Sequence, residues 1–202
     1  MGHSVHLIIG QGAAIAAFLQ QWPSARAVDM RAGWQAIPVD EVLYDAIEAR
    51  YSGASRPSGL DVSPLGLSEA LAEATAKGGG LAYVETEYFG GTGAQAATAF
   101  IDGREVVAPQ SASGAGPVNQ ALRRIGVTRT DADDEFDTIG LGERRTMMDY
   151  EPEGPVRLRG APPSALPFAP PQQAAQNFVP MWVVMLVIAA AVGVGIMASV
   201  MR

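Results

Sequence analysis

Short apolar runs bounded by glycine, proline and aspartate recur along the first half of the chain and predict β-strands. The runs cover residues 4–9, 25–30, 34–39, 81–88, 94–102 and 105–108. The last three are joined by the sequence FGGTG at 89–93 and by Asp102-Gly103. Both connections are typical of tight hairpins, so these three strands are expected to form an antiparallel meander.

Apolar residues with helical spacing separate these strands and predict helices over 13–21, 40–51, 69–77 and 116–125. Asp40 and Ser68 are suitable caps for the second and third of them. The residues after 127 are acidic and predict irregular structure. The pattern therefore favours an α+β fold with a single mixed, largely antiparallel sheet and three or four helices.

The end of the chain has no amphipathic pattern at all. Residues 181–201, MWVVMLVIAAAVGVGIMASVM, form an apolar stretch of 21 residues, and at ~1.5 Å per residue such a helix would match the hydrocarbon thickness of a bilayer. Residues 161–180 contain six prolines, a composition that stays extended. The sequence thus predicts a globular domain at 1–159, a disordered Pro/Ala/Gln-rich linker at 160–179 and a transmembrane helix at 180–202.

The expected position in the cell follows from the two ends of the chain. The apolar run at 5–19 follows no Lys or Arg and is interrupted by Gly10-Gln11-Gly12, which does not match a signal peptide. We therefore expect a tail-anchored, single-pass protein of the cytoplasmic membrane, held in the lipid bilayer through Met181–Met201, with its N-terminal domain in the cytosol. Small residues four apart, Ala189 with Gly193 and Ala191 with Gly195, would allow weak homo-oligomerisation, or simply reflect common membrane-helix composition.

The amino-acid composition excludes some classes of partner and of chemical site. The 202 residues include 14 Lys and Arg against 21 Asp and Glu, a net charge of −7, which argues against nucleic acid as a partner. There is no cysteine, which excludes disulfides, thiolate metal sites and a cysteine nucleophile.

One candidate site lies where the first strand meets the first helix. Gly10-x-Gly12 precedes the helix and Asp29 ends the next strand, as in dinucleotide sites. The fingerprint of dinucleotide sites has a third glycine or alanine, at the position that Ile15 occupies here. A tight strand–helix turn explains the same two glycines. No cofactor is predicted.

A second candidate is the carboxylate pair Glu85 and Glu87, which an alternating strand places on one face. Such a pair can serve hydrolysis, bind a cation or simply face solvent. The same alternation points His3 and His6 to opposite faces, which argues against a shared metal ion.

A third feature is an acidic run of Asp131, Asp133, Asp134, Glu135 and Asp137. It lacks the spacing of a calcium loop, so a solvated surface that faces a partner is the preferred interpretation and no metal site is predicted. The predicted partner-binding residues are therefore Glu85, Glu87, Asp131, Asp133, Asp134, Glu135 and Asp137.

Three segments carry a resemblance to a known group. LAYVETEYFGGTGAQAATAFIDG at 81–103, GPVNQALRRIGV at 116–127 and DEFDTIGLGERR at 134–145 resemble small, mostly uncharacterised bacterial proteins, some of them similar to immunity partners of secreted toxins. The resemblance implies a protein-binding role and no catalytic residue. The proteins of this group are soluble, and the linker and membrane segment predicted here depart from that pattern.

Taken with the acidic surface, the resemblance favours a non-catalytic, immunity-like module that binds an unidentified basic protein. The alternative is a nucleotide-binding or hydrolytic enzyme that uses Gly10 and Gly12 or Glu85 and Glu87.

Overall fold

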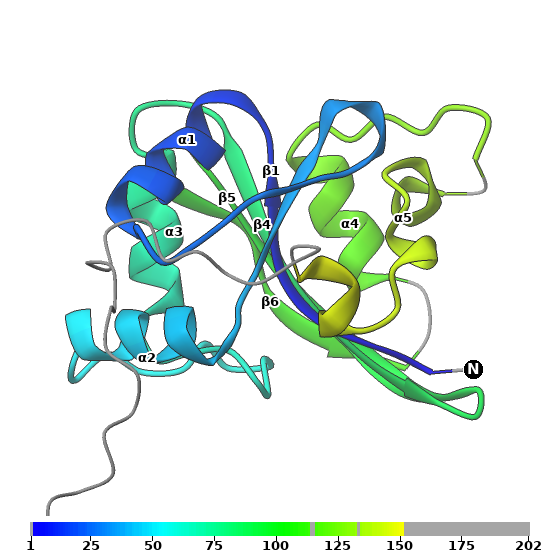
Figure 1. Ribbon diagram of the computed structural model, residues 1–202, viewed down its shortest axis with the longest axis horizontal. Coiled ribbons are helices and arrows are strands. Elements are labelled where there is room, and N and C mark those ends of the chain that lie inside the picture. The colour runs from blue at the N-terminus through cyan, green and yellow to red at the C-terminus, as the bar shows by residue number, and fades with distance from the viewer. Residues whose placement is uncertain (1, 114–115, 133, 152–202) are drawn as a thin grey trace, which may run out of the picture. The chain divides into compact units, whose positions relative to one another are not determined.

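A six-stranded antiparallel sheet lies between two layers of helices in the computed structural model, which describes residues 2–113, 116–132 and 134–151 (Figure 1). The strand order is β2-β3-β1-β4-β5-β6. The strands are β1 (His3–Gly10), β2 (Val28–Asp29), β3 (Gln35–Pro38), β4 (Gly80–Phe89), β5 (Thr92–Ile101) and β6 (Arg104–Ala112). The helices are α1 (Gly12–Gln21), α2 (Glu41–Arg50), α3 (Leu67–Thr75), α4 (Pro117–Arg124) and α5 (Glu135–Thr138), with 3-10 turns η1 (Arg31–Gly33), η2 (Leu141–Glu143) and η3 (Met147–Tyr150).

The predicted α+β class and single, largely antiparallel sheet are confirmed, except that every pair of described strands is antiparallel and the sheet is not mixed. The predicted linker and membrane helix fall within 152–202, outside the described residues. Among the residues that are described, the structure contains no helix with the length and apolarity needed to span a bilayer.

The meander forms where the sequence predicts it. Gly90 and Gly91 join β4 to β5 with φ values of 61° and 85°, and Asp102 and Gly103 join β5 to β6 with φ values of 51° and 75°. Consecutive left-handed residues give the turn twist that matches antiparallel strands. Thr75 at the end of α3 fixes the second hairpin, because its Oγ1 accepts a 3.1 Å hydrogen bond from the Gly103 amide.

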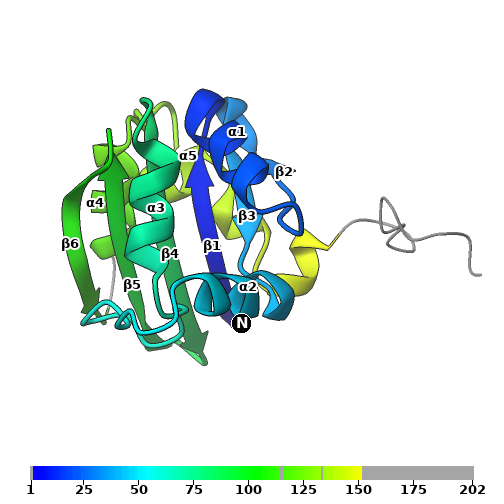
Figure 2. The same cartoon turned by 90° about the vertical axis from the view of Figure 1, so that its left-hand side faces the viewer.

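Both faces of the sheet are buried, which explains why β1 reads as a continuous apolar run rather than an alternating one. Ile8 packs under α1, α2 and α3, together with Tyr83 and Phe100. Leu7 and Ile9 pack on the opposite face against the α4 and α5 layer. Figure 2 shows α1 to α3 on the near side of the strands, with α4 and α5 behind them.

Several details differ from the prediction, among them the length of β6, which runs to Ala112 rather than to residue 108. The described residues contain five α-helices rather than three or four, because the acidic segment after 133 contains α5, whose N-cap Asp134 accepts from the Asp137 amide. Helix α3 begins at Leu67, one residue before the predicted cap, because Gly66 turns the chain in a left-handed conformation. Only residues 28 and 29 of the predicted strand 25–30 pair with β3.

Candidate functional site

The end of the sheet beyond β3 carries polar side chains on both faces. Strand β3 pairs with β1 only from Leu7 to Gly10, whereas β4 follows β1 down to His3. One row across this end contains His6, Glu85, Ala96 and Ser111, each opposite the next on neighbouring strands. Opposite residues of an antiparallel pair share a face, so this row lies on the side of α1 to α3.

This row forms the floor of a hollow of about 250 Å³, which we call the acidic hollow. Its other lining residues are Asp61, Val62, Thr86, Glu87, Ala94 and Gln95. Glu85 and Glu87 therefore do share one face, as predicted. Small residues at 94, 96 and 111 leave the space open between them and the loop that joins α2 to α3.

Glu85 is buried in this hollow, with an exposed fraction of 5%. Its carboxylate accepts hydrogen bonds of 3.0 Å from the backbone amides of Asp61 and Val62, and one of 3.2 Å from the Tyr83 hydroxyl. A buried carboxylate is costly unless such donors satisfy it. Burial, reinforced by the neighbouring Glu85 charge and hydrogen bond, raises the pKa of Tyr83.

Arg56 holds the loop that supplies these amides. Its guanidinium donates to the carbonyl oxygens of Ser63 (2.8 Å) and Asp61 (3.1 Å) and to the Tyr44 hydroxyl (2.8 Å). The loop thus presents its amides to Glu85 in a fixed geometry, which no local sequence pattern predicts.

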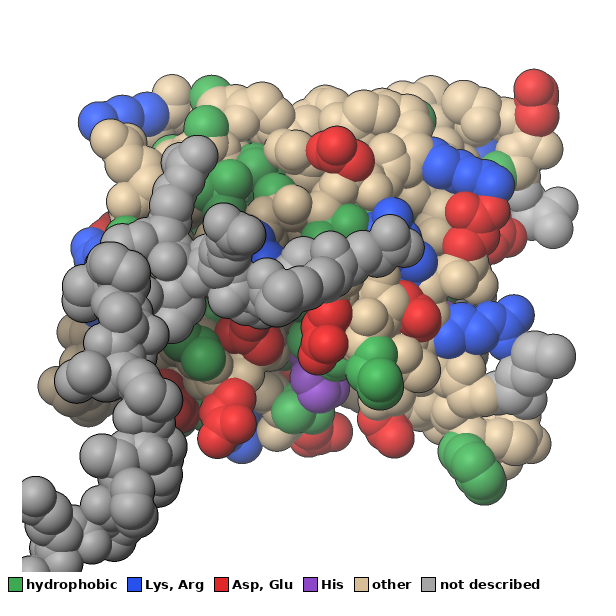
Figure 3. Space-filling view, viewed as in Figure 1, with side chains coloured by type: hydrophobic (Ala, Val, Ile, Leu, Met, Phe, Trp, Pro, Cys, Tyr) green, Lys and Arg blue, Asp and Glu red, His purple; other side chains and the backbone are tan. Residues whose placement is uncertain are grey.

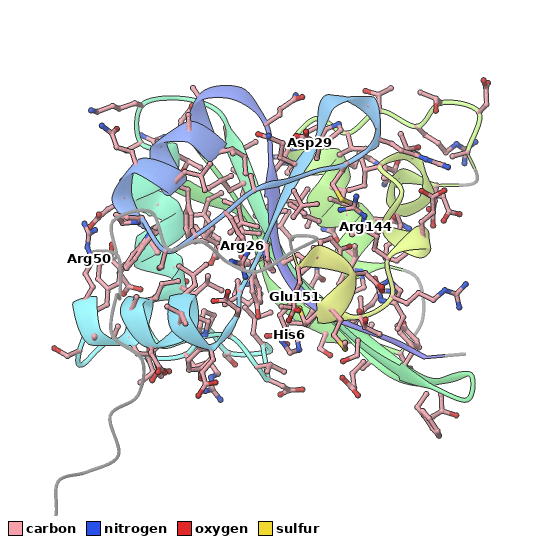
Figure 4. All side chains as sticks on the ribbon, in the orientation of Figure 1. His6, Arg26, Asp29, Arg50, Arg144 and Glu151 are labelled. Atoms are coloured by element: carbon pink, nitrogen blue, oxygen red, sulfur yellow. The ribbon has the colours of Figure 1, made fainter. Side chains whose placement is uncertain are left out.

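Glu87 lies two residues further along β4 and is exposed. Its Oε2 accepts a 2.8 Å hydrogen bond from the Ser4 hydroxyl of β1. His6 lies beside both carboxylates; burial lowers its pKa, while the charges of Glu85 and Glu87 oppose that shift. Figure 3 shows Asp and Glu side chains gathered around a histidine, at the place where Figure 4 labels His6.

The opposite face of the same sheet end has a second hollow, of about 310 Å³, which we call the amide hollow. Its lining residues are His3, Thr86, Tyr88, Gln95, Asn119, Asp134, Phe136, Gly142 and Arg145. His3 and His6 thus face opposite sides, as predicted.

His3 is fully engaged at the amide hollow. Its Nε2 lies 3.1 Å from the carbonyl oxygen of Leu141 and must carry the proton, so Nδ1 accepts the 2.7 Å hydrogen bond from the Thr86 hydroxyl. Burial lowers the pKa of His3. Its ring contacts Phe136 with centroids 5.3 Å apart. These contacts make His3 a structural residue.

The acidic run after 130 lies in the layer of α4 and α5, on the other side of the sheet from the acidic hollow. Asp134 accepts from the Asp137 amide and from Asn119 Nδ2. Glu135 is buried and accepts two 2.9 Å hydrogen bonds from Arg123, whose guanidinium lowers the pKa of Glu135.

Asp131 and Asp137 are exposed, and Asp133 lies outside the described residues. The six predicted partner-binding residues that the structure describes therefore lie on opposite sides of the sheet, and Glu135 is buried rather than solvated. Asp134 and Glu135 also have structural roles within the fold.

The Gly10-x-Gly12 turn has a different setting from a dinucleotide site. Both neighbours of β1 run antiparallel to it, whereas dinucleotide sites require parallel strands. A side chain at Gly10 would collide with Leu81, and Asp29 accepts a 2.9 Å hydrogen bond from Gln35. The structure therefore accounts for these glycines as a tight strand–helix turn.

Comparisons with protein-family models, curated proteins and solved structures found no match. Within 2–113, 116–132 and 134–151, no group of three His, Asp or Glu side chains is placed to hold a metal ion.

Proposed function

We propose that the chain is a membrane-attached, non-catalytic protein-binding module that receives a basic side chain of its partner in the acidic hollow. The observation that carries this proposal is the pair Glu85 and Glu87, held beside His6 in a hollow of about 250 Å³ whose floor consists of four strands.

The geometry supports binding rather than hydrolysis. Both oxygens of Glu85 already accept hydrogen bonds from the protein. A nucleophile or general base has to approach its substrate, whereas a carboxylate fixed in this way acts as a static negative charge. Glu87 is tied to Ser4 by a single hydrogen bond and is exposed, so it can turn towards an incoming cation.

Arginine or lysine fits the chemistry of the hollow. A guanidinium can pair with a carboxylate through two parallel hydrogen bonds, and the aliphatic stem can lie on apolar surface. Ala94 and Ala96 provide that surface beside the two glutamates. Glu85 contributes more than an ordinary surface charge because it is held in a partly dehydrated position.

The membrane segment would place this hollow near a bilayer. A linker of about twenty residues in extended conformation reaches at most ~60 Å, so the domain would sample partners close to the membrane at raised effective concentration. The immunity-like role implied by the resemblance is one form of this function, with a basic toxin as the partner.

The binding test uses the full chain in lipid nanodiscs and N-acetyl-arginine amide, a probe with a basic side chain and no free carboxylate. We expect saturable shifts of the His6 ring signals and binding that is about fivefold weaker in Glu87→Gln, which removes one charge. Asp131→Asn, on the other side of the sheet, is the matched control. Equal binding by the two variants would contradict the proposal.

The membrane part is tested separately. Carbonate-washed membranes should retain the full chain and release a chain truncated after Arg159. Release of the full chain would contradict attachment while leaving the acidic hollow unaffected.

A further inference from the structure

The amide hollow has a hydrogen-bonding character opposite to that of the acidic hollow. Gln95 donates from Nε2 to the Tyr88 hydroxyl at 3.1 Å, and its Oε1 accepts from the Val118 amide at 3.1 Å. Asn119 donates from Nδ2 to Asp134 at 2.7 Å, and its Oδ1 accepts from the Phe136 amide at 2.9 Å. The two amide groups are therefore fixed in orientation from both ends.

The unused hydrogen-bonding groups of this network are donors rather than acceptors. Each side-chain amide nitrogen carries two hydrogens and uses one, and the Tyr88 hydroxyl accepts from Gln95 but keeps its own hydrogen. No acceptor for these three hydrogens occurs among the described residues. Asp134, by contrast, has a donor on each carboxylate oxygen.

The helix dipole at this place also favours an acceptor with negative charge. The hollow lies at the N-terminal end of α4, where Asn119 belongs to the first turn and the helix dipole is positive. Arg145 and Asp134 line the hollow with charges of opposite sign, and both oxygens of the Asp134 carboxylate already accept hydrogen bonds. The rings of Phe136, Tyr88 and His3 provide flat apolar surface beside these donors.

We infer that the amide hollow binds a carboxylate attached to a planar or apolar body. A volume of about 310 Å³ is at the lower end of the range for small-molecule sites. A free aromatic or aliphatic acid and the C-terminal residue of a peptide share this chemistry. The inference concerns the other face of the sheet from the acidic hollow and does not depend on the proposed function.

The test follows the side-chain amide signals of Gln95 and Asn119 by NMR, in the full chain in lipid nanodiscs. Benzoate represents a free acid and N-acetyl-phenylalanine a peptide C-terminus, while N-acetyl-phenylalanine amide lacks the charge. At least one acid should cause saturable shifts below about 10 mM, and the tighter acid identifies the source. Equal shifts with the neutral amide, or no saturable shift with either acid, would overturn the inference.

Variants separate recognition from folding. Gln95→Glu keeps an acceptor for the Val118 amide and replaces the amide hydrogens with a carboxylate oxygen, so binding of the acid should be lost. Tyr88→Phe removes one donor and should weaken binding about five- to tenfold. Gln20→Glu makes the same chemical change at an exposed position of α1, on the opposite face, and should leave the acid affinity unchanged. Unchanged affinity in Gln95→Glu, with native unfolding behaviour, would overturn the inference.

Discussion

The two faces of one sheet end carry opposite chemistry on the same strand. Glu85 and Glu87 point to the acidic hollow, while Thr86 and Tyr88, their neighbours on β4, line the amide hollow with their hydroxyls and ring. The two-residue period of a strand is sufficient to separate them. Two sites of different specificity can thus lie within the thickness of a single sheet.

The faces also differ in how they satisfy buried polar groups. On the acidic side the donors are backbone amides of a loop, at Asp61 and Val62, which Arg56 holds in place. On the other side, Gln95 and Asn119 connect the sheet to α4 and α5 through side chains. The acidic side thus depends on loop position, whereas the amide side depends on helix packing.

The largest expected effect concerns the two helical layers. Leu71 in α3 and Leu122 in α4 are both fully buried, one on each face. Truncation of either to alanine removes packing and leaves a cavity, so each change should lower the free energy of unfolding by about 2–5 kcal/mol. Urea unfolding of both variants measures this. A loss well under 1 kcal/mol for one leucine would show that its layer contributes little to the cooperative fold.

The next effect separates the two glutamates of the acidic hollow. Glu85→Ala leaves the amides of Asp61 and Val62 without their acceptor, and should lower the free energy of unfolding by about 2–3 kcal/mol. Glu87→Ala loses one hydrogen bond at an exposed position and should cost below about 1 kcal/mol. Equal losses in urea unfolding would contradict the different roles assigned to the two carboxylates.

A smaller effect is expected from acidification. Both histidines have pKa values lowered by burial from 6.5, so the unfolded chain binds more protons than the folded chain just below that pH. Stability should therefore fall as the pH drops through about 6.5 and level off below the folded pKa values. Carboxylates with lowered pKa values, such as Glu135, lose their contribution at more acidic pH.

NMR titration can separate the two histidines. Glu87→Gln removes a charge that raises the pKa of His6 and should lower that pKa further, while the pKa of His3 stays the same. A parallel change in both histidines would contradict their placement on opposite faces.

The smallest effect is expected at the hairpin tip. Phe89 is 85% exposed, so Phe89→Ser should change the free energy of unfolding by less than about 0.5 kcal/mol. A large loss on thermal or urea unfolding would mean that this ring packs against the domain.

The sequence predicts the elements better than the sites. Alternation and the Asp102-Gly103 turn are local signals, so the meander could be placed from them. The acidic hollow depends on the register that sets His6 opposite Glu85 and on a loop distant in sequence. Helix α5 could have been found from Asp134, a suitable cap, but the dense acidic charge around it pointed to a solvated run. The amide hollow carries no motif, because Gln95 and Asn119 acquire their role only when β5 meets α4.

The most direct test of two opposite sites titrates both probes into one sample of the full chain. N-acetyl-arginine amide should shift the His6 ring signals and leave the side-chain amide signals of Asn119, which lines only the amide hollow, in place. The tighter of the two acids should do the reverse. Each affinity should be the same in the presence of the other probe. If the arginine probe leaves His6 unchanged, or if either probe shifts both sets of signals alike, the two faces do not carry the separate specificities described for them.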